Sequence, residues 1–172
     1  MIATYVSGGG FYDDYLYLAS PSGSYTNASP TSIGSNWIFL NRTSSPGNTV
    51  DLGTFAAGTV LEFNVLADTH GTDTSQNSEG YLNWYSGSAA LNDDDTAHAI
   101  VDAGYTGVYG GTYVGFEDCF PCGGTGYYED LAYTFTNVTS SVPEPASLLL
   151  LGMGLIALTT CRKYTMSKDA AR

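Results

Sequence analysis

The strongest limit on the fold of this chain is a series of short runs with strand character, separated by turns. Residues 60–65 alternate in the manner of a half-buried strand, with Leu61, Phe63 and Val65 on one face. Other such runs lie at residues 15–18, 36–40, 98–101, 112–116 and 131–136. Turn-forming Gly, Pro, Asn and Asp lie between them, and no helical pattern of useful length precedes residue 145. The sequence therefore predicts an all-β domain, an antiparallel β-sandwich or jelly roll, over residues 1–138.

The charge of the chain is concentrated in this domain. Residues 1–141 contain fifteen acidic residues against one basic residue, Arg42, which gives a net charge of −14. Phosphate backbones and anionic lipid headgroups repel such a surface, so we do not expect nucleic-acid binding. Abundant Tyr and polar loop residues with almost no Lys are typical of a β-rich extracellular domain. The acidic charge suits either a binder of divalent cations or a protein that must stay soluble outside the cell.

A single long apolar run, residues 146–161, lies near the C-terminus. As a helix it would measure about 24 Å, against about 30 Å for the hydrocarbon core of a membrane. Two prolines keep Glu144 extended and outside this helix, and a basic pair after it would stay on the cytoplasmic side. The pattern predicts a C-terminal hydrophobic helix that holds the domain at the membrane while an enzyme reads the polar motif. A retained anchor is the alternative.

This segment resembles the PEP-CTERM sorting signal. The residues that carry the resemblance are Val142, Pro143, Glu144 and Pro145, the Leu- and Gly-rich run, and the basic stop formed by Arg162 and Lys163. The resemblance implies recognition by an exosortase, a membrane-embedded transpeptidase-like enzyme of Gram-negative bacteria that make exopolysaccharide. The expected layout is a domain at 1–138, a linker at 139–142, the sorting signal and helix at 143–163, and a short cytoplasmic tail at 164–172.

The resemblance also implies a location. We expect an exported protein that is tethered to the inner membrane before processing and then reaches the cell surface or the exopolysaccharide matrix. Residues 1–6 carry no basic n-region and no long apolar stretch, so no signal peptide is visible in this sequence. An export leader is therefore expected upstream of Met1.

The domain resembles a second family, a bacterial extracellular domain of unknown function. The motifs are Gly115-Phe116-Glu117-Asp118, the Gly-rich stretch after it, and Glu129-Asp130-Leu131, together with residues 84–87 and 92–99. The resemblance implies a β-sandwich without established catalytic activity. We expect no enzymatic function and a structural or adhesive role; a Ca²⁺- or carbohydrate-binding module is the alternative, and a polysaccharide hydrolase is a third reading.

Four acidic residues are candidate Ca²⁺ ligands, because they match acidic positions of this second family. They are Asp94, Glu117, Asp118 and Asp130. Carboxylates from two loops can supply several of the six to eight oxygens that Ca²⁺ prefers. The alternative is that these acids cap turns and accept backbone hydrogen bonds. No other cofactor is expected.

Cys119 and Cys122 form a C-x-x-C pattern with no second pair to complete a zinc site. Gly123 and Gly124 follow directly, so the helix that usually lowers a redox thiol pKa is not expected. The favoured interpretation is a local disulfide in an exported loop, and the alternative is a pair of free thiols. The two histidines form no catalytic pattern, and the sequence predicts no catalytic residues.

Overall fold

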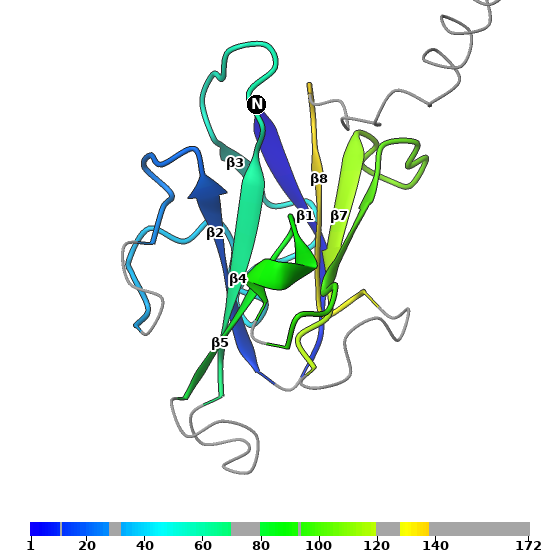
Figure 1. Cartoon of the computed structure of the whole chain (residues 1–172). Helices are drawn as coiled ribbons and strands as arrows, with labels where there is room; N and C mark the ends of the chain where they lie inside the picture. The colour runs from blue at the N-terminus through cyan, green and yellow to red at the C-terminus, as the bar shows by residue number, and fades with distance from the viewer. Residues whose placement is uncertain (11, 28–31, 70–79, 93, 120–127, 138–172) are drawn as a thin grey trace, which may run out of the picture. The chain divides into compact units, whose positions relative to one another are not determined.

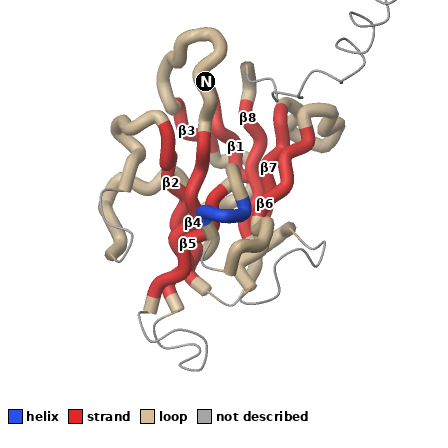
Figure 2. The backbone as a smooth tube through the Cα atoms, viewed as in Figure 1, coloured by secondary structure: helices blue, strands red, loops and turns tan. Residues whose placement is uncertain are grey.

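Strands make up almost all the regular structure of the described chain (Figures 1 and 2). The structure is a computed structural model that describes residues 1–10, 12–27, 32–69, 80–92, 94–119 and 128–137. These residues form eight strands and one 3₁₀ turn, η1 (Ala89–Leu91), which the Ser88 side chain caps. The chain divides between Ser140 and Ser141 into two units, and every described residue belongs to the first.

Two antiparallel sheets make up the described fold. The larger sheet has the order β3-β1-β8-β7-β6. Its strands are β1 (Ile2–Gly8), β3 (Thr49–Asp51), β6 (Ala99–Asp102), β7 (Thr112–Phe116) and β8 (Leu131–Phe135). The smaller sheet has the order β2-β4-β5, with β2 (Asp13–Ser20), β4 (Glu62–Asp68) and β5 (Tyr81–Tyr85). The prediction of an all-β, antiparallel domain is confirmed.

One hydrophobic core lies between the two sheets. Inward-facing residues of both sheets belong to it, including Tyr5, Leu16, Val65, Trp84, Phe116 and Tyr133. Phe63 of β4 stacks on Phe135 of β8, with ring centroids 4.4 Å apart. Buried aromatic rings of this size dominate the hydrophobic stabilisation of a core. The stacked pair therefore binds one sheet directly to the other.

Alternation along β2 places an acidic residue on the core side. Leu16 and Leu18 face the core, and Asp14 occupies the same face two residues before Leu16. Asp14 is completely buried and lies opposite Ala67 of β4, which is also buried. An acidic side chain at an inward strand position requires a partner, because burying a charge alone is costly.

The strand predictions succeed best where the run is both apolar and central. The prediction at 112–116 coincides with β7, and the run at 131–136 contains β8. Residues 36–40 were predicted as a strand but make only an isolated bridge, Tyr15 to Leu40. Their apolar side chains still pack on the core, and the Leu16 amide and carbonyl bond to this segment. Strands β1, β3 and β5 were not predicted.

The predicted linker, hydrophobic helix and tail, residues 139–172, lie outside the described residues. Among the residues that the structure does describe, no helix has the length and apolar character needed to cross a membrane.

Candidate functional site

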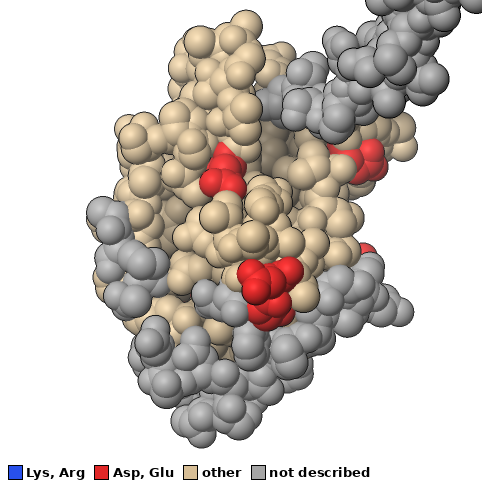
Figure 3. Space-filling view, viewed as in Figure 1, with Lys and Arg blue, Asp and Glu red and all other residues tan. Residues whose placement is uncertain are grey.

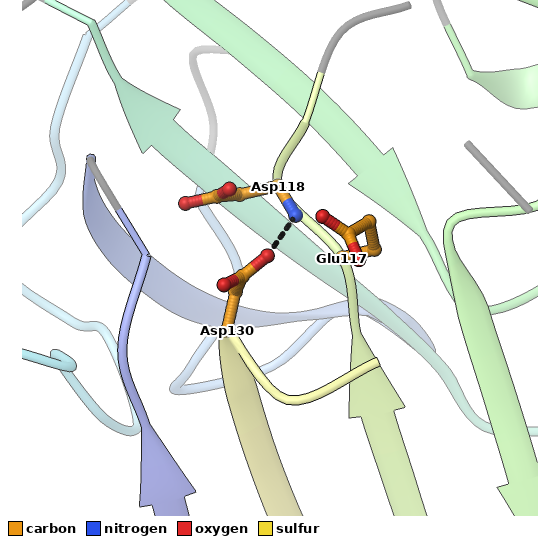
Figure 4. A group of neighbouring side chains, drawn as sticks. All are labelled: Glu117, Asp118 and Asp130. Atoms are coloured by element: carbon orange, nitrogen blue, oxygen red, sulfur yellow. Dashed lines mark hydrogen bonds between the residues drawn. The ribbon is translucent and has the colours of Figure 1, made fainter. Parts of the chain in front are cut away.

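Three of the four predicted Ca²⁺ ligands come together at one end of the β7–β8 ladder (Figure 4). Phe116 pairs with Leu131 at the end of these strands, so Glu117 and Asp118 leave the sheet beside Asp130. One carboxylate oxygen from each of the three acids lies within 4.8 Å of the others. The Asp118 amide donates to Oδ2 of Asp130 at 3.0 Å, and the Asp130 amide donates to the Phe116 carbonyl at 3.0 Å. Backbone bonds thus fix this group in place.

A fourth acid, Asp14, joins this group from the other sheet. Its charge acts on both Asp118 and Asp130, and its carboxyl group meets that of Asp118. We call Asp14, Glu117, Asp118 and Asp130 the acid cluster. Glu117 and Asp118 are buried, at 9% and 4% exposure, and Asp14 at 0%. The structure therefore gathers carboxyl groups from β2 and from the ends of β7 and β8, three of them buried and that of Asp130 half-buried.

Asn41 holds the chain around Asp14. Its Nδ2 amino group donates to Oδ2 of Asp14 at 2.8 Å and to the carbonyls of Gly9 and Tyr12, both at 2.9 Å. Its Oδ1 accepts a bond from the Asp14 amide at 3.1 Å. One side chain thus fixes both the turn between β1 and β2 and the orientation of the Asp14 carboxyl group.

Burial and mutual repulsion raise the pKa values of two members of the acid cluster. Burial raises the pKa of Asp14 well above its usual range, and the charges of Asp118 and Asp130 raise it further. Burial is also the largest cause for Asp118, followed by the neighbouring Asp130, and its pKa rises to about 7. The raised pKa values of Asp14 and Asp118 both indicate that negative charge on these groups is poorly compensated within the protein.

Two carboxyl oxygens of the acid cluster accept no hydrogen bond from any described residue. They are Oδ1 of Asp14 and Oδ2 of Asp118. The contact between the Asp14 and Asp118 groups is a hydrogen bond only when one of the two carboxyl groups keeps its proton, and the raised pKa values favour that form. The Tyr133 hydroxyl is also buried without a partner, and it does not donate to Asp14.

The fourth predicted ligand, Asp94, lies in a different environment. Its Oδ2 is 3.0 Å from Nε2 of His98, and its Oδ1 accepts bonds from the amide and hydroxyl of Thr96 at 3.0 and 2.8 Å. Partial burial acts to raise the pKa of Asp94, but the bonds from His98 and Thr96 outweigh it and lower the pKa. Asp94 is thus not part of the acid cluster.

His98 is fully buried against Trp84. The two rings stack with centroids 3.7 Å apart and an angle of 13° between their planes. Nδ1 of His98 lies 2.9 Å from the Glu117 carbonyl, which can only accept, so Nδ1 carries a proton in this arrangement. We call Asp94 and His98 the histidine pair. On the other side of the ring, Nε2 lies 3.0 Å from Oδ2 of Asp94 and 3.1 Å from the Thr96 hydroxyl.

Other predicted site residues are only partly covered. Cys119 is disulfide-bonded, and Cys122, its predicted partner, lies outside the described residues. Val142, Pro143, Glu144, Pro145, Arg162 and Lys163 also lie outside them. On the face drawn in Figure 3, acidic side chains form small separate groups, and the described surface of that face shows no Lys or Arg.

Sequence reasoning missed Asp14 and Asn41. The signal for Asp14 was present, because it precedes Leu16 and Leu18 at strand spacing and so had to point inward. No sequence pattern pointed to Asn41. Its hydrogen bonds join segments that lie 27 to 32 residues apart in the chain, and the sequence does not show that they meet.

An all-β domain followed by a proline-bracketed acid, an apolar run and a basic pair is the organisation of an exported protein sorted through its C-terminus. Residues 141–163 match the family model of the PEP-CTERM protein-sorting motif. The predicted resemblance of residues 142–163 is therefore confirmed, and the motif implies export and processing by an exosortase at the membrane. No curated protein and no solved structure matches the chain. The resemblance of residues 1–138 to an extracellular domain stays a prediction.

Proposed function

We propose that this chain is a non-enzymatic envelope protein that reaches the cell surface or the exopolysaccharide matrix, where its β-sandwich domain has a structural or adhesive role. The sorting motif at residues 141–163 is the observation that carries the proposal. The high content of Tyr and the net charge of −14 over residues 1–141 support a location outside the cytoplasm. The acid cluster is buried rather than facing across a cleft, which argues against a pair of acids that flank a glycosidic bond.

The sorting segment supplies the route. The apolar segment at 146–161, predicted from the sequence to be helical, would hold the exported domain at the inner membrane, with Arg162 and Lys163 on the cytoplasmic side. The exosortase then reads the extended Pro143-Glu144-Pro145 triplet outside the helix and releases the domain. The helix and the tail at 164–172 are absent from the mature protein.

Mass spectrometry of the mature C-terminus tests this route. We expect the surface form to end before residue 146 in a strain with an exosortase, and to accumulate uncleaved in the membrane when Glu144 is replaced by Ala. Substitution of Pro46, a proline of the β-domain, is the matched control and leaves processing unchanged. Surface protein that still contains Arg172 would show a retained anchor instead.

A second candidate function, carbohydrate binding, is favoured by a cavity on the outer face of β2, β4 and β5. Tyr17, Asn64 and Tyr85 lie side by side across the three strands, on the side away from the core. They line a cavity of about 300 Å³, together with Asn27, Glu62 and Asn83. Amide, carboxylate and phenol groups match sugar hydroxyls, and a tyrosine ring offers an apolar face.

Binding of the full-length chain, in mild detergent, to exopolysaccharide of the producing strain tests this candidate. We expect Tyr85→Ala and Asn83→Ala each to weaken binding roughly tenfold, the loss of about 1.4 kcal/mol. Tyr81→Ala is the matched control, because Tyr81 lies on the same face of β5 outside the cavity. Equal binding by all three variants contradicts carbohydrate recognition at this cavity.

A further inference from the structure

We infer that the acid cluster binds a Ca²⁺ ion, with Asp14, Asp118 and Asp130 as its main ligands and Glu117 as a fourth carboxylate. The ion would lie at the end of the core and would hold β2 of the smaller sheet against β7 and β8 of the larger one. This inference goes beyond sorting and surface location and does not depend on them.

The convergence of the four acids is built into the fold. Asp118 and Asp130 are placed by the last pair of the β7–β8 ladder, and Asp14 by the inward face of β2. Asn41 fixes Asp14 through two hydrogen bonds of its own. Carboxyl groups from two sheets thus converge, although like charges repel and Asp14, Glu117 and Asp118 are buried.

The described residues offer this cluster little compensating positive charge. Arg42 is the only Lys or Arg among the described residues, and its guanidinium bonds to the exposed Asp13 at 2.8 Å. Of the causes that act on the Asp14 pKa, the influence of Arg42 is the smallest. His98 is occupied by Asp94 and by the Glu117 carbonyl.

The two unsatisfied oxygens point to a cation in particular. Oδ1 of Asp14 belongs to a side chain with no exposure to solvent, and Oδ2 of Asp118 belongs to one that is 4% exposed. One shared proton would satisfy the contact between Asp14 and Asp118 but would leave the other carboxylates unbalanced. A divalent cation with oxygen ligands neutralises several carboxylates together.

The backbone beside the acid cluster lies too close to the carboxylates to carry a side chain at Gly10. Gly10 has a φ of +76°, and a Cβ at this position would lie 2.4 Å from Oδ2 of Asp118. The turn between β1 and β2 therefore approaches the carboxylates closely. An irregular set of carboxylates, completed by backbone carbonyls or water, suits Ca²⁺ better than Mg²⁺, which requires near-octahedral geometry.

Thermal unfolding and calorimetric titration of the full-length chain in mild detergent test the inference. After chelation, we expect Ca²⁺ to bind with a Kd on the order of 10⁻⁴ M, the range of extracellular modules. At about 100 times the Kd, the Tm should rise by roughly 5–10 °C. Mg²⁺ at the same concentration should give a much smaller rise.

Two variants locate the site without depending on loss of folding. Asp14→Asn and Asp118→Asn replace a repelled carboxylate by an amide that can donate to its neighbour, so we expect the metal-free Tm to be unchanged or higher. Both variants should lose the Ca²⁺-dependent rise. Asp102→Asn, at an exposed acid of β6, should keep it.

Three results would overturn the inference. The first is the absence of both heat and a Tm rise with Ca²⁺ in the unaltered chain, which would assign a shared proton to Asp14 and Asp118. The second is a rise that survives in both variants, which would place the ion elsewhere. The third is an equal rise with Mg²⁺, which would indicate a general ionic effect.

Discussion

The histidine pair and the acid cluster bury carboxylates in the same domain but balance them differently. At the histidine pair, Asp94 lies 3.0 Å from the imidazole of His98, and its other bonds come from Thr96. At the acid cluster, Asp14 and Asp118 have oxygens that no described residue satisfies. At the histidine pair, hydrogen bonds from His98 and Thr96 satisfy Asp94, which indicates a structural role. The acid cluster has carboxyl oxygens without a partner among the described residues. This difference separates an acid with a structural role, Asp94, from acids that are candidate metal ligands.

The largest effect is expected at Asn41. The substitution Asn41→Ala removes the donor to two buried acceptors, at Asp14 and Tyr12, and to the partly buried Gly9 carbonyl. Each unsatisfied buried group costs about 1–3 kcal/mol, so we expect a loss of about 4 kcal/mol in unfolding free energy. Denaturant titration measures it. A loss below that of His98→Ala would show that the acid cluster does not depend on Asn41.

His98→Ala tests the other member of the comparison. It removes the imidazole that bonds to Asp94, and with it the ring that stacks on Trp84. We expect a loss of about 3 kcal/mol, because breaking one half of a buried pair leaves a charge uncompensated. The Ca²⁺-dependent rise in Tm should be unchanged. Loss of that rise in the His98→Ala variant would show that Ca²⁺ binding depends on the histidine pair as well.

The two sites should respond to pH with opposite signs in the metal-free protein. Asp118 keeps its proton to about pH 7 when folded but releases it near 3.8 when unfolded. Between these values the folded state binds more protons, so raising the pH lowers stability. The lowered pKa of Asp94 has the opposite effect: stability present above its unfolded pKa is lost as the pH falls through the folded value.

Thermal unfolding across pH 3 to 8 therefore should show a Tm maximum on the acidic side, with a decline towards neutrality. Asp118→Asn should flatten the decline and leave the acid limb in place. A Tm that rises steadily to pH 8 in the chelated protein would contradict the raised pKa of Asp118.

The smallest effect is expected at the surface. Arg42 and Asp13 form an ion pair whose side chains are 46% and 49% exposed. Such pairs contribute about 0–1 kcal/mol, so Arg42→Ala should barely change the unfolding free energy or the Ca²⁺ response. A loss as large as that of His98→Ala would identify Arg42 as the counter-ion of Asp14 and would weaken the contrast between the two sites.

How far the sequence predicts this fold depends on the kind of segment. The runs that became β7 and β8 are apolar and lie between other strands, so their composition was enough. β3 has three residues and exists through its pairing with β1, which no local pattern reports. Residues 36–40 have the apolar composition of a strand, but only Leu40 pairs, because the chain turns at Asn41 to bond the β1–β2 turn.

The candidate site was predicted in the same uneven way. Glu117, Asp118 and Asp130 were found because a motif places them at the two ends of one loop. Asp94 was grouped with them by motif alone, and the structure pairs it with His98 instead. Asp14 lies more than 100 residues from Asp118 in the sequence, so only the packing of one sheet on the other brings them together.

The position of β8 also bears on how the domain meets mechanical load. β8 is the last strand of the described residues, and it lies inside its sheet, paired with β1 on one side and β7 on the other. Tension applied through a C-terminal attachment enters the domain at this strand. Extraction of β8 has to break two ladders of hydrogen bonds and separate the stacked rings of Phe135 and Phe63. A domain pulled from this end is therefore loaded at a strand that is paired along both edges.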